Sequence, residues 1–541
     1  MRTRKRKNGR RIVRISKRKR EPVINSELSI SNCGSRAKCG FGWMVLLLLL
    51  FGVSVAVRLP YLNRPLDGHH EWLTAQTLVI HSIWYERGIV ACGFQPIVTF
   101  GLPADKNIIA SMGKIASPTT GDYYYTSQPP LGYILPYLVL RLLGLRPDVL
   151  PLQVFNLAVH LVCVLLIFLI VRRLALHRGL RLPEIPALTG AAVYTFMPVA
   201  LWFHGNVYSF EILVQVFFLL AIYLFLRVLE RPARSAWLYV ALAATAFCMS
   251  YTESLGVLFA FSIGLYTLFH FRDRTVRRAA LAVAAGMTAA LCLTFVQYSQ
   301  IAGVEEFLRR ATGTYLKRSG LSNALSLENS SLLNWKVWER VIRHYVNGFG
   351  LLPFVFAIAA FAIVCGKSIK DMAVRFGPME RAVVLLALLP TVLHHLVFFD
   401  FTAIHDYSVL KDTVFLSLLA GMLCYLLMLD GGQQILNGIL AAAFVCSLLI
   451  GIGQFWKLNR ESRDSFKETG EIMARTTKPD EVIFAVMEEL CPQIVFYAHR
   501  NIAEYWGEQS ARELIRKNGA RRGIIFEIDE DGRCEEYRYI E

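Results

Sequence analysis

The sequence has little charge. Asp, Glu, Lys and Arg make up only 18% of its 541 residues, whereas a soluble domain carries about 25%. Apolar residues make up 55%, and the mean hydropathy is +0.42. This shortage of charge, together with repeated long apolar runs, excludes a water-soluble enzyme and predicts an α-helical polytopic membrane protein.

Acidic residues are scarcer still, with 41 Asp and Glu against 58 Lys and Arg and a formal net charge of +17. The basic residues gather in the N-terminal tail and in short loops, where they orient a chain in a membrane rather than bind phosphodiesters. Nucleic acid is therefore not an expected partner. Residues 1–42 should form a disordered, basic cytoplasmic tail, because Met1–Arg20 contains twelve Lys or Arg and no acid.

The sequence also lacks the cysteine spacings of metal sites. Its 11 cysteines are scattered singly, and most lie in apolar runs, where a thiol behaves as a small hydrophobe. Cys491 and Cys534 both lie in the hydrophilic C-terminal segment. A disulfide between them and two free thiols are equally compatible with the sequence.

Apolar runs of spanning length recur throughout residues 43–456, each close to the roughly 20 residues that a bilayer requires. When successive spans cross the membrane in opposite directions, starting from a cytoplasmic N-terminus, every short basic loop falls on the cytoplasmic side. This agreement requires Leu131–Leu145 to be an interfacial or re-entrant helix, or half of an overlooked pair, so 11 to 13 transmembrane helices are expected. The predicted spans are 43–59, 151–171, 185–203, 210–229, 237–251, 255–271, 279–299, 348–365, 382–399, 409–429 and 435–455.

Three hydrophilic regions lie outside these spans. They are a first outer loop at 60–148, a second outer loop at 301–347, and residues 457–541, which we expect to form a small extracytoplasmic α/β domain. The elements expected there are strands at Glu481–Val486, Gln493–Tyr497 and Arg522–Ile528 and a helix near Ser510–Lys517.

Carboxylates and histidines follow the first span directly, at Asp67, His69, His70 and Glu71. A carboxylate held at the membrane surface can act as the general base on an acceptor hydroxyl or amine. If a helix begins at Gly68, Asp67 could instead serve only as its N-cap. A metal site built from the two histidines and Glu71 is a further alternative.

Glu211 and Glu253 lie near the outer ends of their spans, where a transporter would use such residues as a proton relay. A transporter should also show inverted repeats and central helices broken by Gly or Pro, and we find neither in the sequence. Polar residues gather instead in the outer loops.

Several motifs occur together in a definite order. They are Arg58-Leu59-Pro60 at the end of the first span, the acidic motif after it, Gln128-Pro129-Pro130-Leu131-Gly132-Tyr133, His405-Asp406-Tyr407 before a late span, and the external α/β tail. In this order and spacing, most of the chain resembles the GT-C glycosyltransferases, which use polyprenyl- or dolichyl-phosphate sugars. It is most similar to the branch of protein O-mannosyltransferases and lipid A aminoarabinose transferases.

The resemblance implies a catalytic acid at Asp67 or Glu71. Asp67 is favoured, because the turn before a helix projects a side chain more freely than the helix body does. Relatives need no histidine cluster, so no resident metal is expected, and a divalent ion remains an alternative. The residues implied in substrate binding are Arg58, His69, His70, Asp122, Gln128, Arg309, Arg310, Lys317, His405, Asp406 and Tyr407.

The sequence thus predicts an integral membrane glycosyltransferase in a bacterial plasma membrane. It would transfer a sugar from a polyprenyl-phosphate donor to a glycan, lipid or protein acceptor on the outer face, with inversion. Two alternatives stay open. One is a ligase or polymerase that uses a polyprenyl-diphosphate glycan, and the other is a transporter or flippase without covalent chemistry.

Overall fold

The computed structural model describes residues 33–108, 113–230, 236–321, 334–352, 355, 376–430, 434–458, 464–487 and 491–541. The chain divides into two compact units, Met1–Leu46 and Leu47–Glu541. In the first unit, the described residues form the start of helix α1 (Cys33–Arg58). The predicted tail at 1–42 lies mostly outside the described residues. Everything below concerns the second unit.

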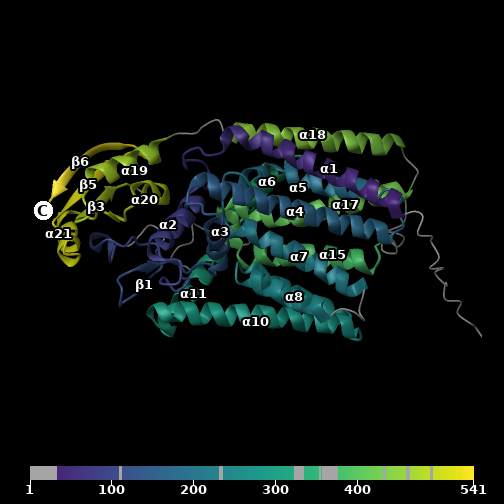
Figure 1. Cartoon of the computed structure of the whole chain (residues 1–541), viewed down its shortest axis with the longest axis horizontal. Helices are drawn as coiled ribbons and strands as arrows, with labels where there is room; N and C mark the ends of the chain where they lie inside the picture. The colour runs from purple at the N-terminus through teal and green to yellow at the C-terminus, as the bar shows by residue number, and fades with distance from the viewer. Residues whose placement is uncertain are drawn as a thin grey trace, which may run out of the picture. The chain divides into compact units, whose positions relative to one another are not determined.

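Apolar helices make up most of the second unit (Figure 1). Six helical stretches in the described residues are long and apolar enough to cross a membrane: Phe41–Tyr61, Val149–His177, Phe210–Glu230, Arg274–Ala302, Pro378–Val397 and Asp406–Leu429. The last five correspond to α4 (Val149–His177), α7 (Phe210–Glu230), α10 (Arg274–Ala302), α15 (Pro378–Val397), and η5 (Asp406–Lys411) with α17 (Asp412–Asp430).

Further apolar helices are shorter or less uniform. They are α5 (Glu184–Phe196), α6 (Pro198–Phe203), α8 (Ala236–Ser250), α9 (Leu255–Phe269) and α18 (Gln434–Leu458). The helices pack in a chain of neighbours, with α5 on α4 and α17, α7 on α4 and α8, and α10 on α8 and α9.

The stretch 185–203, predicted as one span, does not form one continuous helix. The chain forms two helices there, because Met197 takes an extended conformation with ψ 137° and Pro198 starts α6. Proline has no amide hydrogen to continue the preceding helix. The span predicted at 348–365 lies largely outside the described residues.

The first loop, residues 60–148, consists of several short helices and strands. Its helix α2 (Trp72–Arg87) begins at Trp72, with Glu71 in the N-cap position. The N-cap role considered for Asp67 is therefore wrong, since the helix starts later than Gly68. The remaining elements are η2 (Leu59–Tyr61), η3 (Pro103–Asp105), β1 (Ile115–Ala116), β2 (Tyr123–Tyr124) and α3 (Leu131–Leu142).

The second loop, residues 301–347, is helical where it is described. It contains α11 (Val304–Ser319) and α12 (Trp335–Phe349). Both contact α16 (Phe399–Ile404), a short helix that follows α15 and precedes η5. This packing brings the second loop beside the segment that carries His405 and Asp406.

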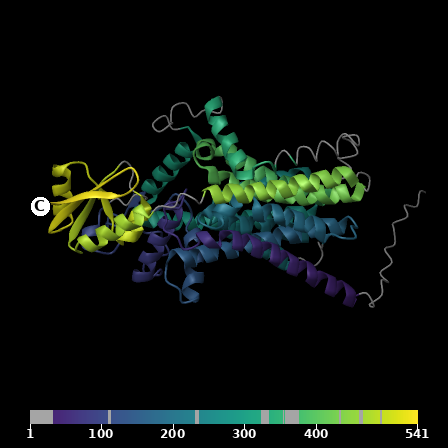
Figure 2. The same ribbon diagram turned by 90° about the horizontal axis from the view of Figure 1, so that it is seen from above.

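The C-terminal segment forms a four-stranded sheet in the order β4-β3-β5-β6 (yellow arrows in Figure 2). Strand β3 pairs in parallel with β4 and β5, and β6 is antiparallel to β5. The elements in chain order are α19 (Ser465–Thr476), β3 (Glu481–Val486), α20 (Pro492–Ala498), β4 (Ile502–Glu504), α21 (Glu508–Lys517), β5 (Arg522–Ile528) and β6 (Cys534–Ile540).

Two strands and one helix predicted for this segment are present, as β3, β5 and α21. The strand predicted at Gln493–Tyr497 is wrong, because these residues form α20. A short apolar run cannot be assigned to helix or strand by periodicity alone, and Pro492 at the first helical position favours the helix. No disulfide joins Cys491 to Cys534.

Candidate functional site

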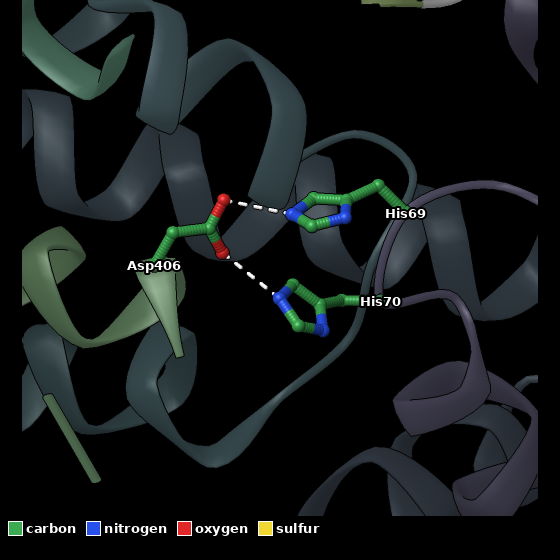
Figure 3. Close-up of side chains that lie close together, drawn as sticks. All are labelled: His69, His70 and Asp406. Atoms are coloured by element: carbon green, nitrogen blue, oxygen red, sulfur yellow. Dashed lines mark hydrogen bonds and ion pairs between the residues drawn. The ribbon is translucent and has the colours of Figure 1, made fainter. Parts of the chain in front are cut away.

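The two adjacent histidines of the first loop meet an aspartate that lies 337 residues away (Figure 3). His69 Nε2 lies 2.7 Å from Asp406 Oδ2, and His70 Nε2 lies 2.9 Å from Asp406 Oδ1. We call these three residues the His-His-Asp centre. It joins two motifs that the sequence placed near the same pocket by resemblance alone.

Local backbone geometry aims both histidines at Asp406. His70 has a φ of 59°, in the left-handed region that non-glycine residues rarely adopt. The indole of Trp202 donates a hydrogen bond to the His69 carbonyl at 3.2 Å. The His70 ring lies 4.9 Å from the Tyr407 ring, edge to face. These contacts hold the turn so that neighbouring imidazoles face one carboxylate.

Burial favours the neutral form of two histidines at this site, His70 and His405. Burial lowers the pKa of His70, although the nearby Asp406 carboxylate opposes this shift. Burial also lowers the pKa of His405 to about 3, with added repulsion from His70 and Arg318. A neutral imidazole keeps a lone pair, which can accept a proton or bind a metal ion.

The His-His-Asp centre can hold a divalent metal ion. One ligand atom from each residue lies within 4.8 Å of the others. Among the described residues, no donor is aligned for a hydrogen bond with Asp406 Oδ1, although His70 Nε2 is close. Two imidazoles and a carboxylate suit zinc and similar ions. This set differs from the alternative considered in the sequence, because Asp406 takes the place of Glu71.

Glu71 lies inside the turn. Its carboxylate is buried and accepts hydrogen bonds from Arg64 at 2.6 Å, from the Gly68 amide at 2.8 Å and from Asn206 at 3.3 Å. Both carboxylate oxygens are thus occupied. Asp67 is only partly buried. Of the two predicted acids, Asp67 is the more accessible to a substrate.

Lys114 and three cations of α11 repel one another, and one of the three, Arg318, also acts on His405 beside the His-His-Asp centre. Desolvation lowers the pKa of Lys114 although part of its side chain is exposed, and repulsion from Lys317, Arg318 and Arg310 lowers it further. We call these four residues the basic cluster. The guanidinium of Arg318 lies 5.1 Å above the ring of Phe401, in the segment that leads to Asp406. The predicted binding residues Arg310 and Lys317 therefore share one charged region.

Other predicted binding residues are engaged elsewhere. Asp122 is fully buried and accepts hydrogen bonds from Arg87 and Lys106. Burial alone would raise the pKa of Asp122, but these two cations outweigh burial and lower it. This arrangement favours a structural role for Asp122. Arg309 pairs with Glu306 on its own helix.

Arg58 and Gln128 are both buried within the second unit. Arg58 Nη2 lies 3.0 Å from His160 Nδ1, and its Nε donates to the Leu201 carbonyl. Among the described residues, Arg58 Nη1 has no hydrogen-bond partner. The Gln128 carbonyl accepts a hydrogen bond from Tyr298 at 2.6 Å. Neither residue contributes to the His-His-Asp centre itself.

Ion pairs join the spans near this region. Lys411 Nζ lies 3.8 Å from Glu211 and 3.9 Å from Glu253, and Asp412 contacts His395 at 2.8 Å. Lys411 and Asp412 thus each pair with residues of other helices.

Several residues of the site were missed by sequence reasoning. Asn206 and Trp202 support the first-loop turn from the segment after α5, and Tyr497 reaches it from the C-terminal segment. Lys114 belongs to the basic cluster. No local pattern marks them, because each acts through a contact with a distant part of the chain.

No protein-family model matches the chain, and no curated protein sequence matches it. Solved structures do. ArnT from Cupriavidus metallidurans, bound to undecaprenyl phosphate, aligns with a TM-score of 0.56 at 13% identity, over 90% of this chain and 93% of ArnT. The chain therefore shares the fold of ArnT. The predicted resemblance is thus confirmed at the level of the fold.

Two structures of an oligosaccharyltransferase from Archaeoglobus fulgidus are also similar. AglB in complex with an inhibitory peptide and a dolichol-phosphate aligns with a TM-score of 0.54 at 13% identity, over 90% of this chain and 69% of AglB. The enzyme in complex with zinc and sulfate aligns with a TM-score of 0.54 at 13% identity, over 89% of this chain and 67% of that chain. At these identities, the likeness concerns the fold alone.

Proposed function

We propose that this chain is an integral membrane glycosyltransferase that takes a sugar from a polyprenyl-phosphate donor. The observation that carries the proposal is the contact of the first-loop motif with Asp406, with Arg318 of the basic cluster over Phe401 in the segment that leads to Asp406. Two structures that share the fold hold dolichol-phosphate and undecaprenyl phosphate. A phosphate leaving group needs such positive charge around it.

Asp67 is the proposed base. Its carboxylate would take a proton from the acceptor hydroxyl or amine as that atom attacks the anomeric carbon. The bond to the donor phosphate breaks in the same displacement, which inverts the anomeric configuration and releases polyprenyl phosphate. Lys114, Lys317 and Arg318 would hold the phosphate oxygens. The guanidinium of Arg318 can donate two parallel N–H hydrogen bonds to a pair of these oxygens. Glu71 would shape the turn.

The His-His-Asp centre would hold a divalent metal ion in this reaction. Zinc is present in one structure of the similar archaeal oligosaccharyltransferase. When bound, such an ion supplies Lewis-acid charge to a phosphate oxygen. His69, His70 and Asp406 would fix its position next to the first-loop turn. In the absence of the ion, Asp406 holds the two imidazoles together.

We place the first loop, the second loop and the C-terminal segment on the outer face of a bacterial plasma membrane, with the N-terminus in the cytoplasm. The basic short loops support this orientation. The acceptor would be a glycan, a lipid or a protein. Eleven to thirteen helices would cross the bilayer.

The test is donor turnover by the purified chain. Short-chain polyprenyl-phosphate sugars and polyprenyl-diphosphate sugars would be supplied with membrane extract as acceptor, for wild type and for Asp67→Asn. We expect wild type to release polyprenyl phosphate and Asp67→Asn to lose roughly 100-fold or more of that rate. Release of diphosphate would favour the ligase or polymerase. No release from any donor would contradict glycosyl transfer and favour the transporter.

A further inference from the structure

The C-terminal segment reaches into the first loop beside the proposed base. The hydroxyl of Tyr497 accepts a hydrogen bond from the backbone amide of Leu66 at 3.0 Å. Leu66 is buried and directly precedes Asp67. The Leu66 amide belongs to the planar Pro65–Leu66 peptide unit, and the carbonyl of that unit accepts a hydrogen bond from the Asp67 amide at 3.2 Å. Fixing this unit therefore restricts the backbone that carries the Asp67 side chain.

Apolar packing supports this contact. Leu66 belongs to a buried cluster with Leu78, Leu152 and Tyr208, and the rings of Phe496 and Tyr497 pack against that cluster. Helix α20 of the C-terminal segment lies against α2 of the first loop. The tyrosine ring is therefore held by packing, and its hydroxyl is aimed at one amide.

A buried ion pair anchors the same segment three residues further on. Arg500 Nε lies 3.1 and 3.0 Å from the two carboxylate oxygens of Asp105, and both side chains are buried. The remaining guanidinium nitrogens donate to the carbonyls of Lys478 and Glu481 at 2.9 and 2.7 Å. Because Arg500 is bonded to both the first loop and the C-terminal segment, it fixes their relative position.

Neighbouring residues add to the anchor. Asn501 donates to the Asp105 carbonyl at 3.0 Å. His499 ends α20 in a left-handed conformation with φ 53°, and its ring lies 4.6 Å from the ring of Phe100. The stretch 497–501 is thus bound to the first loop through side chains of several chemical types.

The other supports of the turn come from the helical part of the unit or from the turn itself. The Asn63 amide donates to Gln153 in α4 at 2.8 Å, and Arg64 pairs with Glu71 within the turn. Tyr497 differs from these supports because it belongs to the C-terminal segment. The position of the first-loop acid therefore depends on two separate parts of the chain.

We propose that Tyr497 is a positioning residue for Asp67, and that the Arg500–Asp105 ion pair is the anchor that keeps Tyr497 in place. The C-terminal segment is then a part of the catalytic scaffold, in addition to any contact it makes with an acceptor. This inference rests on the proposed function for its catalytic consequence. The structural coupling can be tested without any turnover.

The first experiment measures amide hydrogen exchange in the full-length chain, with Tyr497→Phe as the test variant and Tyr537→Phe, on the exposed face of β6, as the matched control. We expect exchange in the peptide that covers residues 62–71 to quicken roughly fivefold or more in Tyr497→Phe and to stay at the wild-type rate in Tyr537→Phe, as loss of one hydrogen bond implies. Arg500→Lys should quicken the same peptide. Unchanged exchange in both variants would overturn the inference.

The second experiment is a double-mutant cycle on donor turnover. We expect Tyr497→Phe to lower kcat about tenfold with the donor KM unchanged, and to cause no further loss in the Asp67→Asn background. An equal loss in both backgrounds would show that Tyr497 does not act through Asp67. No turnover by wild type would overturn the proposed function instead, and the exchange result would still decide the structural coupling.

Discussion

Arg64 and Glu71 form a buried ion pair across the first-loop turn, with 2.6 Å between Nη2 and Oε1. The side chains are 10% and 1% exposed, so the pair lies out of bulk water. The same guanidinium lies 5.7 Å from the Trp202 ring. The sequence presented Glu71 as a rival base, whereas its carboxylate is engaged by Arg64.

Glu71→Gln should therefore destabilise the chain. Removing one partner leaves a buried, unpaired cation, which typically costs roughly 3–5 kcal/mol. We expect a clear fall in the melting temperature of the detergent-solubilised protein, and partial recovery when Arg64→Met is added, because the second change removes that cation. A Glu71→Gln variant with an unchanged melting temperature and no turnover would make Glu71 the base instead of Asp67.

Metal binding at the His-His-Asp centre can be measured directly. We expect about one divalent ion per chain, by elemental analysis after dialysis against zinc, and loss of that ion in Asp406→Asn or in excess chelator. His270→Gln is the control, because His270 bonds to the Tyr266 carbonyl in its own helix. Equal metal content in Asp406→Asn and wild type would show that the ion binds elsewhere.

The Asp105 carboxyl should link stability to pH. Burial raises its pKa from 3.8 to about 6, and Arg500 opposes this rise. Between these two values the folded chain holds a proton that the unfolded chain has released, so the stability contributed by Asp105 falls as pH rises from about 4 to 6. It is constant above that range.

Melting temperatures at pH 4.5 and 7 measure this linkage. We expect the difference between the two temperatures to change in Asp105→Asn, and to match wild type in Asp480→Asn, a change at an exposed position. Identical pH dependence in Asp105→Asn and wild type would mean that Asp105 has the same affinity for protons in the folded and unfolded chains.

The basic cluster should govern donor affinity. Lys317→Ala removes a cation near Lys114 and Arg318, so we expect the donor KM to rise roughly 5- to 10-fold, and the effect to shrink at high salt as screening grows. Lys467→Ala, on α19, serves as the control for loss of one positive charge. A donor KM that is equal in wild type and Lys317→Ala would place the phosphate elsewhere.

Much of the helical architecture can be predicted from the sequence, because a run of about 20 apolar residues has few alternatives to a helix. The predicted runs at 151–171, 210–229 and 279–299 all fall within single helices, α4, α7 and α10. The break at Met197 was missed, since the proline that starts α6 lies within an otherwise unbroken apolar run.

The site was harder to predict. His69, His70 and Asp406 were each identified, but their contact depends on how distant helices pack, and local periodicity carries no such information. Tyr497 was missed for a further reason. Its segment was assigned as a strand, and only the helical turn of α20 with the left-handed His499 accounts for its place beside Leu66.

The contact between Leu66 and Tyr497 also means that the first loop cannot reach its final structure until the C-terminal segment has been synthesised. The two residues are 431 positions apart. At a synthesis rate of about 5 to 20 residues per second, roughly 20 to 90 seconds separate their emergence from the ribosome. During that interval the loop lacks Asp406 for most of the time and Tyr497 throughout. A nascent chain therefore cannot present the finished centre to a lipid-linked donor before the last helices are inserted.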